Sequence, residues 1–223
     1  MAIIRIDING NVNIGVFAVA TDKFVLVRFD AEEKIVESLE RTLDVPVIKA
    51  KIGDSTLIGV LVSANSKGIL VPYYASDDEI RQLHEKLGGD VNIERLPSKL
   101  TALGNLILTN DKHAIVHPEF DFKAIRIIAD VLDVEVLRRE NYTIPLVGSC
   151  GVATNKGILL NPMFSDEEIE WISSIFKVPI GIGTVNHGMP FVGAGMIANS
   201  KGAAVGLNTT YHEMVRISET LGV

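Results

Sequence analysis

We predict an α/β fold, a five-bladed propeller with pseudo-fivefold symmetry closed by the N-terminal strand, because three features of the sequence agree on it. A glycine followed eight residues later by a lysine occurs five times, and successive glycines are 44 or 45 residues apart. The count from the last glycine, through the two chain ends, to the first glycine is also 45. An open array of repeats has no reason to keep that count, because its end repeats are caps. The third feature is a strand that the last repeat lacks and the N-terminus supplies. The five pairs are Gly15 and Lys23, Gly59 and Lys67, Gly104 and Lys112, Gly148 and Lys156, and Gly193 and Lys201.

The repeat at Gly59 shows the elements of one unit in order. The apolar, β-branched run LIGVLVSA at 57–64 predicts a strand that the glycine opens. A polar turn at 65–68 joins it as a hairpin to a second strand, ILVPYY at 69–74. Ser76 and Glu79 have the spacing of a capping box, so a helix begins there, and Gly88 ends it. The alternating segment VNIERL at 91–96 predicts a third strand.

The other repeats place a helix start at the same distance from the lysine. Ser165 with Glu168, and Thr210 with Glu213, repeat the capping box, and Asp121 holds the position in the third repeat without a partner glutamate. In the first repeat we expect Asp30 with Glu33 to cap the helix, two residues earlier than in the others. Third strands are expected at 45–50, 134–139 and 178–183.

The fifth repeat ends with its helix, at Leu221-Gly222-Val223, and has no third strand. The segment IIRIDI at 3–8 has the character of that missing strand. Pairing the two ends of the chain would bury strand edges that are otherwise prone to association. We therefore expect residues 1–223 to form a single domain of five repeats of about 44–45 residues, with helices outside.

Composition narrows the class of function. The chain is 47% hydrophobic and 22% charged, which is typical of a globular domain, and its formal net charge is −7. An acidic protein is a poor candidate for general phosphate-backbone binding. The single cysteine fits a reducing compartment, no secretory signal is seen, and no apolar run approaches the about 18 residues that would cross a membrane. We expect a cytoplasmic protein that contacts other proteins or a limited piece of nucleic acid.

No set of residues in the sequence assembles a nucleophile, a base and an orienting group. Cys150 stands two places after its repeat glycine, where the other repeats have Phe17, Leu61, Leu106 and Gly195, so it is interpreted as a buried packing residue. The five histidines are scattered and show no metal-binding spacing. We therefore expect no catalytic residues, no metal and no cofactor.

Residues that break the repeat are better functional candidates. One place after each glycine stand Val16, Val60, Asn105, Ser149 and Ala194, of which Asn105 and Ser149 are the polar ones. The loops that join the repeats also differ. The loop Asn186–Phe191 is more apolar than a solvated loop requires, which indicates either contact with a partner or packing of Phe191 beneath the loop.

Several strings resemble the pentein fold and, within it, the translation initiation factor 6 family. They are LIGVLVSANSKGILVP at 57–72, LTALGN at 100–105, IIADVLDVEV at 127–136, GTVNHG at 183–188 and GAGMIAN at 193–199. The resemblance extends from Met1 to Val223. The chain lacks the C-terminal tail of eukaryotic members, so the archaeal form fits better.

This resemblance implies a specific function. Members bind the intersubunit face of the large ribosomal subunit, contact its ribosomal protein fourteen near the sarcin-ricin loop, and block joining of the small subunit. They also act in late maturation of the large subunit. A monomer is expected. By resemblance, we place the ribosome interface near Asn105, with Val60 and Ser149 around it and with Asn186, Phe191 and Val192 in the last repeat.

The alternative that the fold leaves open is an enzyme. Catalytic penteins include guanidine-modifying hydrolases and amidinotransferases that use Cys, His and carboxylates. This chain has one cysteine, at a position expected to be packed, and its length fits five bare repeats without active-site insertions. A generic scaffold for another protein assembly is the second alternative.

Overall fold

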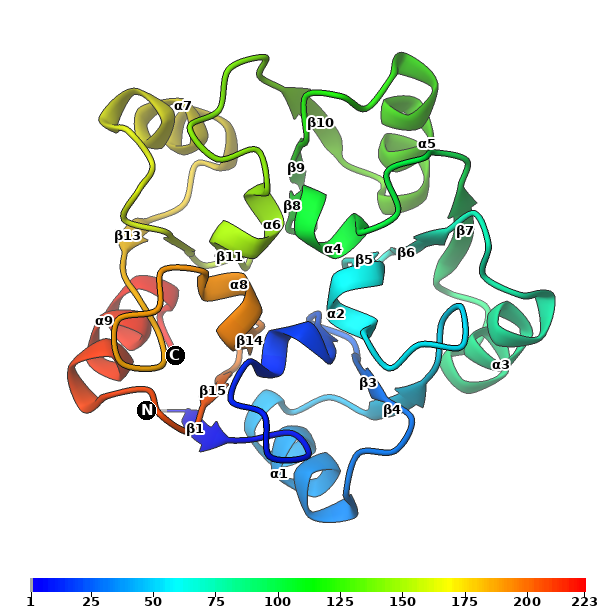
Figure 1. The fold of residues 1–223 in the computed structure, drawn as a ribbon, viewed down its shortest axis with the longest axis horizontal. Helices are drawn as coiled ribbons and strands as arrows, with labels where there is room; N and C mark the ends of the chain where they lie inside the picture. The colour runs from blue at the N-terminus through cyan, green and yellow to red at the C-terminus, as the bar shows by residue number, and fades with distance from the viewer. Residues whose placement is uncertain (1) are drawn as a thin grey trace.

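A computed structural model describes residues 2–223 of the protein. Five three-stranded sheets surround a central axis, with long helices on the outside (Figure 1). In each sheet the first two strands form an antiparallel hairpin and the third pairs with the second in parallel. This is the α/β propeller of five similar units that was predicted from the sequence.

We call the sheets blades 1 to 5 in the order of their first strands. Their strands are β2 (Ala18–Ala20), β3 (Val25–Arg28) and β4 (Val47–Ala50); β5 (Ser63–Ala64), β6 (Gly68–Pro72) and β7 (Asn92–Leu96); β8 (Ile107–Thr109), β9 (His113–Val116) and β10 (Glu135–Arg138); β11 (Gly151–Ala153), β12 (Ile158–Leu160) and β13 (Ile180–Ile182); and β14 (Met196–Ala198), β15 (Ala203–Gly206) and β1 (Ile3–Ile6).

The N-terminal strand completes blade 5, as predicted. β1 pairs in parallel with β15, from Ile3 opposite Ala203 to Ile6 opposite Gly206. The first strand of the chain thus occupies the place that the third strand has in every other blade, and the two chain ends lie near each other in Figure 1. The pairing covers an edge of β15 that would otherwise expose unpaired backbone groups.

In each blade one long helix of 11 residues follows the second strand. These are α1 (Glu33–Leu43), α3 (Asp77–Leu87), α5 (Phe122–Leu132), α7 (Asp166–Phe176) and α9 (Tyr211–Leu221). The predicted capping boxes form at Ser76, Ser165 and Thr210, and Asp121 accepts a hydrogen bond from the Ala124 amide. The cap predicted for blade 1 is wrong: α1 begins after Glu32, which makes no capping bond, and Asp30 pairs with Arg28 instead.

The prediction that each repeat glycine opens a strand is also wrong. Every repeat glycine lies in a helical turn that precedes the strand, and the apolar run at 57–64 divides into a turn and a two-residue strand. β-branched residues favour strands, but packing near the axis overrides that preference. The turns are η1 (Ile14–Val16), α2 (Ile58–Leu61), α4 (Leu103–Leu106), α6 (Val147–Cys150) and α8 (Val192–Gly195).

The five repeat glycines form a closed ring of backbone contacts at the axis. A Cβ atom on Gly59 would collide with the carbonyl oxygen of Gly15, and one on Gly104 with that of Gly59. The series continues through Gly148 and Gly193 and returns to Gly15, whose added Cβ would meet the carbonyl of Gly193. Only glycine permits this approach, because each obstacle is backbone and cannot rotate away.

Each hydrophobic cluster of the core spans two blades. Ile197 and Ala204 of blade 5, for example, pack with Val25 and Leu39 of blade 1. Leu26 of blade 1 packs in turn with the core of blade 2. The blades are therefore not separate folding units, and each depends on its neighbour for burial of its apolar side chains.

Asparagine side chains in the hairpin turns join some neighbouring blades and not others. The Asn65 amide donates to the carbonyls of Asn110 and Leu132 in blade 3, at 3.1 and 2.8 Å, and Asn199 does the same from blade 5 to blade 1. Asn110 donates to the Thr154 carbonyl of blade 4 at 3.1 Å. Thr21 and Thr154 stand at this position in blades 1 and 4, and their hydroxyls bond only within their own turns. The sequence of the turn thus decides which blades it joins.

The glycine ring gives a test of the fold by substitution. We expect Gly104→Ala to destabilise the protein by at least about 3 kcal/mol, because its methyl group would force two backbone segments apart. Gly89→Ala is the matched control, since an added Cβ there meets no atom within 4 Å. Urea unfolding measures both, and equal midpoints for the two variants would contradict the proposed role of the ring.

Candidate docking face

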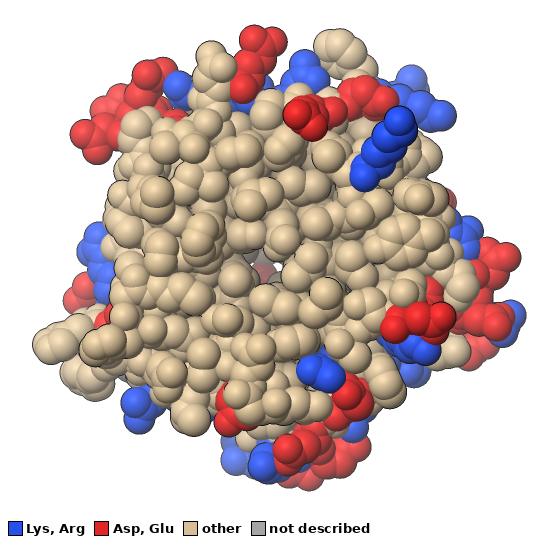
Figure 2. Space-filling model, viewed as in Figure 1, with Lys and Arg blue, Asp and Glu red and all other residues tan. Residues whose placement is uncertain are grey.

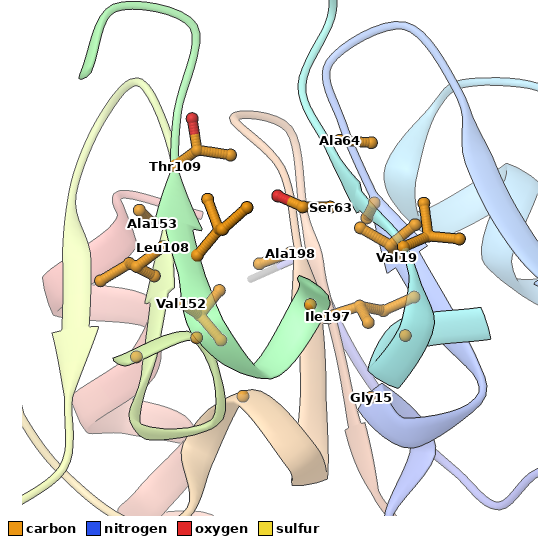
Figure 3. A pocket seen from close by; sticks show the side chains of 18 of the residues that line it. Gly15, Val19, Ser63, Ala64, Leu108, Thr109, Val152, Ala153, Ile197 and Ala198 are labelled. Atoms are coloured by element: carbon orange, nitrogen blue, oxygen red, sulfur yellow. The ribbon is translucent and has the colours of Figure 1, made fainter. Parts of the chain in front are cut away.

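The axis of the propeller holds a cavity of about 100 Å³ that lacks reactive groups. Its walls are the repeat glycines and two rings of side chains from the first strands. Figure 3 shows Val19, Leu108, Val152 and Ile197 in one of these rings, with the Ser63 hydroxyl as its polar member. The lining contains no cysteine, histidine or charged residue. Among the described residues, the only side-chain polar groups that line the cavity are the hydroxyls of Ser63 and Thr109, and no residue of the lining could act as a base toward them.

The far end of the axis, where the hairpin turns meet, contains two carboxylates that are already bonded. The Asn155 amide donates to Asp111 at 2.6 Å and to Asp22 at 2.8 Å, across the ring. The backbone and hydroxyl of Ser200 donate to Asp22, and those of Ser66 donate to Asp111. Within residues 2–223 no group of three or more His, Cys, Asp or Glu side chains is placed to hold a metal ion.

Cys150 lies in the core of blade 4, as its position in the repeat predicted. Its side chain is fully buried, and Phe17, Leu61 and Leu106 are buried at the equivalent positions. Burial raises the pKa of the thiol to about 11, and the hydrogen bond from the Asn161 amide, at 3.7 Å, only partly offsets this. The thiolate that nucleophilic catalysis requires is therefore scarce at neutral pH.

The two ends of the propeller differ in chemistry. We call the end that carries the helical turns the docking face. Figure 2 shows it without lysine, arginine or acidic residues over its central part, and the charged residues lie at its periphery. Exposed apolar side chains occur on it at two repeat positions. Phe29, Tyr73 and Leu207 are exposed fourteen residues after a repeat glycine, and Leu57, Leu146 and Phe191 two residues before one.

The structure places the six predicted interface residues on or beside this face. Val60, Asn105 and Ser149 occupy the third positions of α2, α4 and α6, so they lie around the axis. Val60 and Asn105 are partly exposed, whereas Ser149 is 9% exposed. A role for these residues in binding a partner remains a prediction.

The other three predicted residues come from the loop before blade 5 and the start of α8. Phe191 is 38% exposed, so its side chain faces solvent and does not pack beneath the loop. Val192 is the first residue of α8, and its side chain is fully buried in the core. The Asn186 amide donates to the Val12 carbonyl at 2.9 Å, which ties this loop to the first one. Of Phe191 and Val192, only Phe191 has a side chain that is exposed to solvent.

The sequence analysis missed Leu57 and Leu146, which stand at the same repeat position as Phe191. A comparison of the residues two places before each glycine would have found them. These residues are Asn13, Leu57, Ala102, Leu146 and Phe191.

The sequence analysis also missed a second role for the capping glutamates. Glu213 accepts hydrogen bonds from the Gly188 amide at 2.8 Å and the Thr184 hydroxyl at 2.7 Å, in addition to those from Thr210 in its own cap. Partial burial alone would raise the pKa of Glu213, but these hydrogen bonds outweigh it and lower the pKa to about 2. The carboxylate therefore stays ionised and holds the loop before blade 5. Sequence spacing gives no sign of such a bond, because its partners are more than 20 residues apart.

No helix within residues 2–223 has both the length and the apolar character needed to cross a membrane.

Comparison with known proteins gives close relatives along the whole chain. A family model described as "eIF-6 family" matches residues 3–220. Translation initiation factor 6 of Pyrococcus horikoshii is 47% identical over 225 aligned positions, covering 100% of this chain and 99% of that protein. The protein of the same name from Saccharolobus islandicus (strain L.S.2.15) is 42% identical, covering 98% of each.

Solved structures also match, at much lower identity. A citrulline complex of DDAH from Pseudomonas aeruginosa has a TM-score of 0.45 and 14% identity, and covers 73% of this chain and 66% of that one. An adduct of dimethylarginine dimethylaminohydrolase with S-methyl-L-thiocitrulline has a TM-score of 0.44 and 13% identity, with 92% of this chain and 71% of that chain covered.

The hydrogen bonds that Glu213 accepts from Thr210 in its cap and from the loop at 184–188 predict a stability change in acid. The pKa of Glu213 is about 2 in the folded protein and about 4.3 in an unfolded chain, so its contribution is complete above about pH 4.3 and is lost as the pH falls toward 2. Solvent screening of this partly exposed group leaves about 1–2 kcal/mol. Between pH 5 and pH 2.5, the free energy of unfolding measured in urea should fall further in the wild type than in Glu213→Gln, by this contribution. The exposed Glu219→Gln on the same helix should behave as the wild type, and a Glu213→Gln curve parallel to the wild type would refute the assignment.

Proposed function

The chain belongs to the eIF-6 family, and we propose that it acts as a translation initiation factor by binding the large ribosomal subunit and preventing its premature association with the small subunit. The partner on the subunit is ribosomal protein fourteen, in the vicinity of the sarcin-ricin loop RNA. The protein acts in the cytoplasm as a monomer, and its binding to immature large subunits also gives it a role in their biogenesis.

The observation that carries this proposal is the docking face. A broad surface with exposed apolar side chains and few charges is suited to contact with another macromolecule. Its lack of lysine and arginine over the centre favours a protein contact over a phosphate contact. Ribosomal protein fourteen meets that requirement, and the nearby RNA would then lie beside the charged periphery.

The mechanism requires no chemistry. A body that covers a surface needed by the small subunit prevents joining for as long as it stays bound. A closed ring loses little conformational freedom when it docks, so little of the binding free energy is spent on ordering it. The bonded carboxylates, the buried Cys150 and the unreactive axial cavity support a non-catalytic factor.

Co-sedimentation with purified subunits tests the proposal. The wild type should sediment with large subunits and not with small ones, and it should reduce formation of joined ribosomes, measured by light scattering, in proportion to the subunits it occupies. Asn105→Lys should weaken binding at least tenfold, about 1.4 kcal/mol, because it places a charge at the centre of the docking face.

Lys156→Ala is the matched control, because this exposed lysine belongs to a hairpin turn at the opposite end of the propeller. It should bind as the wild type does. Binding to small subunits alone, or to neither subunit, would refute the proposed function. Unchanged binding by Asn105→Lys would remove Asn105 from the interface.

A further inference from the structure

One repeat position on the docking face has the same backbone in all five blades and different side chains. The residue that precedes each helical turn has φ between −79 and −85° and ψ between 54 and 74°. Leu57, Leu146 and Phe191 occupy this position in blades 2, 4 and 5, and are 38, 39 and 38% exposed. Blades 1 and 3 have the polar Asn13 and the small Ala102. The differences are therefore in the side chains alone.

The same three blades have a glutamate that holds the loop before the helical turn. Glu79 accepts bonds from the amides of Gly53 and Asp54, at 3.0 and 3.1 Å. Glu168 accepts bonds from the amide and the hydroxyl of Thr143, at 2.6 and 2.8 Å.

Glu213 accepts bonds from the loop at 184–188 in the corresponding way in blade 5. The equivalent helix positions in blades 1 and 3 are Ile35 and Ala124, which have no carboxylate. An apolar side chain and a loop-holding glutamate thus occur together in three blades, and both are missing in the other two.

We propose that Leu57, Leu146 and Phe191 form a three-point docking site for an apolar protein surface on the large subunit, and that Glu79, Glu168 and Glu213 are the positioning residues that hold its loops in place. The proposal rests on the proposed function, because it takes the large subunit as the partner. Loops that are fixed before binding lose less freedom when the partner arrives. Apolar side chains that are partly exposed on a fixed backbone can be buried by a partner with little further loss of freedom.

Charge identifies the partner as protein. The three carboxylates bind the loops that carry the docking residues, and the central part of the face has no lysine or arginine. Lys51 lies near Glu79, but it already pairs with Asp54 of the same loop. A phosphate backbone would meet negative charge there, and no basic side chain over the centre would displace the counterions from the nucleic acid. An apolar protein surface has no such cost.

The three-point site also determines how the protein is rotated about its axis when it binds. A body with pseudo-fivefold symmetry offers five similar rotations about its axis to a flat partner. Large apolar side chains in blades 2, 4 and 5, and none in blades 1 and 3, make those rotations unequal in energy. The glycine ring fixes the backbone of the docking face. The residues two places before the repeat glycines differ between blades, and this difference selects one orientation for docking.

Affinity for purified large subunits tests the site. Leu57→Ser, Leu146→Ser and Phe191→Ser should each weaken binding at least tenfold. Phe122→Ser is the matched control, since this phenylalanine is 80% exposed at the start of the outer helix α5, away from the axis, and its affinity should stay within twofold of the wild type. Urea midpoints equal to the wild type would show that the variants fold.

The outcomes separate the two proposals. If the wild type does not bind large subunits, both are overturned. If it binds and the three variants stay within twofold of it, the docking site alone is overturned. The affinity should change less than about threefold between 50 and 200 mM salt, whereas a fall of about 10³ or more would identify phosphate as the partner and overturn the protein contact.

A double-mutant cycle tests the positioning role. Glu213→Gln should weaken binding, and its effect should be non-additive with that of Phe191→Ser, because both act on the same contact. A glutamate that only stabilises the fold would leave the affinity unchanged well below the unfolding temperature. An unchanged affinity, or strictly additive losses, would overturn the role of Glu213.

Discussion

The contact of one repeat glycine with the carbonyl of the preceding one is the constraint on which the rest of this structure depends. It brings five backbone segments close to a single axis, and it fixes the helical turns, the strands that leave them and the face they form. The contact leaves no room for a side chain, so the axis has no place for a catalytic group from these positions. The same constraint therefore holds the five blades together at the axis and keeps side chains away from these five positions.

The blades share one backbone but differ in the side chains at certain equivalent positions, and these side chains make different contacts. Asparagine in a hairpin turn joins a blade to the next, and threonine in the same place does not. In the same way, a glutamate at the third helix position holds a loop, and an isoleucine or alanine does not. Each residue in the repeat can be compared with four residues in the same backbone environment, so a difference in contacts can be assigned to the side chain. We infer the docking site from those comparisons and not from any single residue.

Most of the fold could be predicted from the sequence, because its signals are local and repeated. The turn lysines, the capping boxes at Ser76, Ser165 and Thr210, and the N-terminal strand all follow from spacing. The helical turns could not be predicted, because an apolar run such as that at 57–64 has the same pattern whether it is a strand or a buried turn. Leu57, Leu146 and the loop bonds of the glutamates depend on exposure and on contacts across more than 20 residues, which spacing alone does not show.

The central claim is that the N-terminal strand closes a single cooperative ring. Native-state hydrogen exchange at β1 tests this claim most directly. If Ile3–Ile6 complete blade 5, their hydrogen-bonded amides should open with a free energy within about 1 kcal/mol of that of the β6 amides, because both open only when the whole ring unfolds. Exchange of the β1 amides with an opening free energy near zero, while β6 stays protected, would mean that the ring is not closed by this strand and would contradict the account.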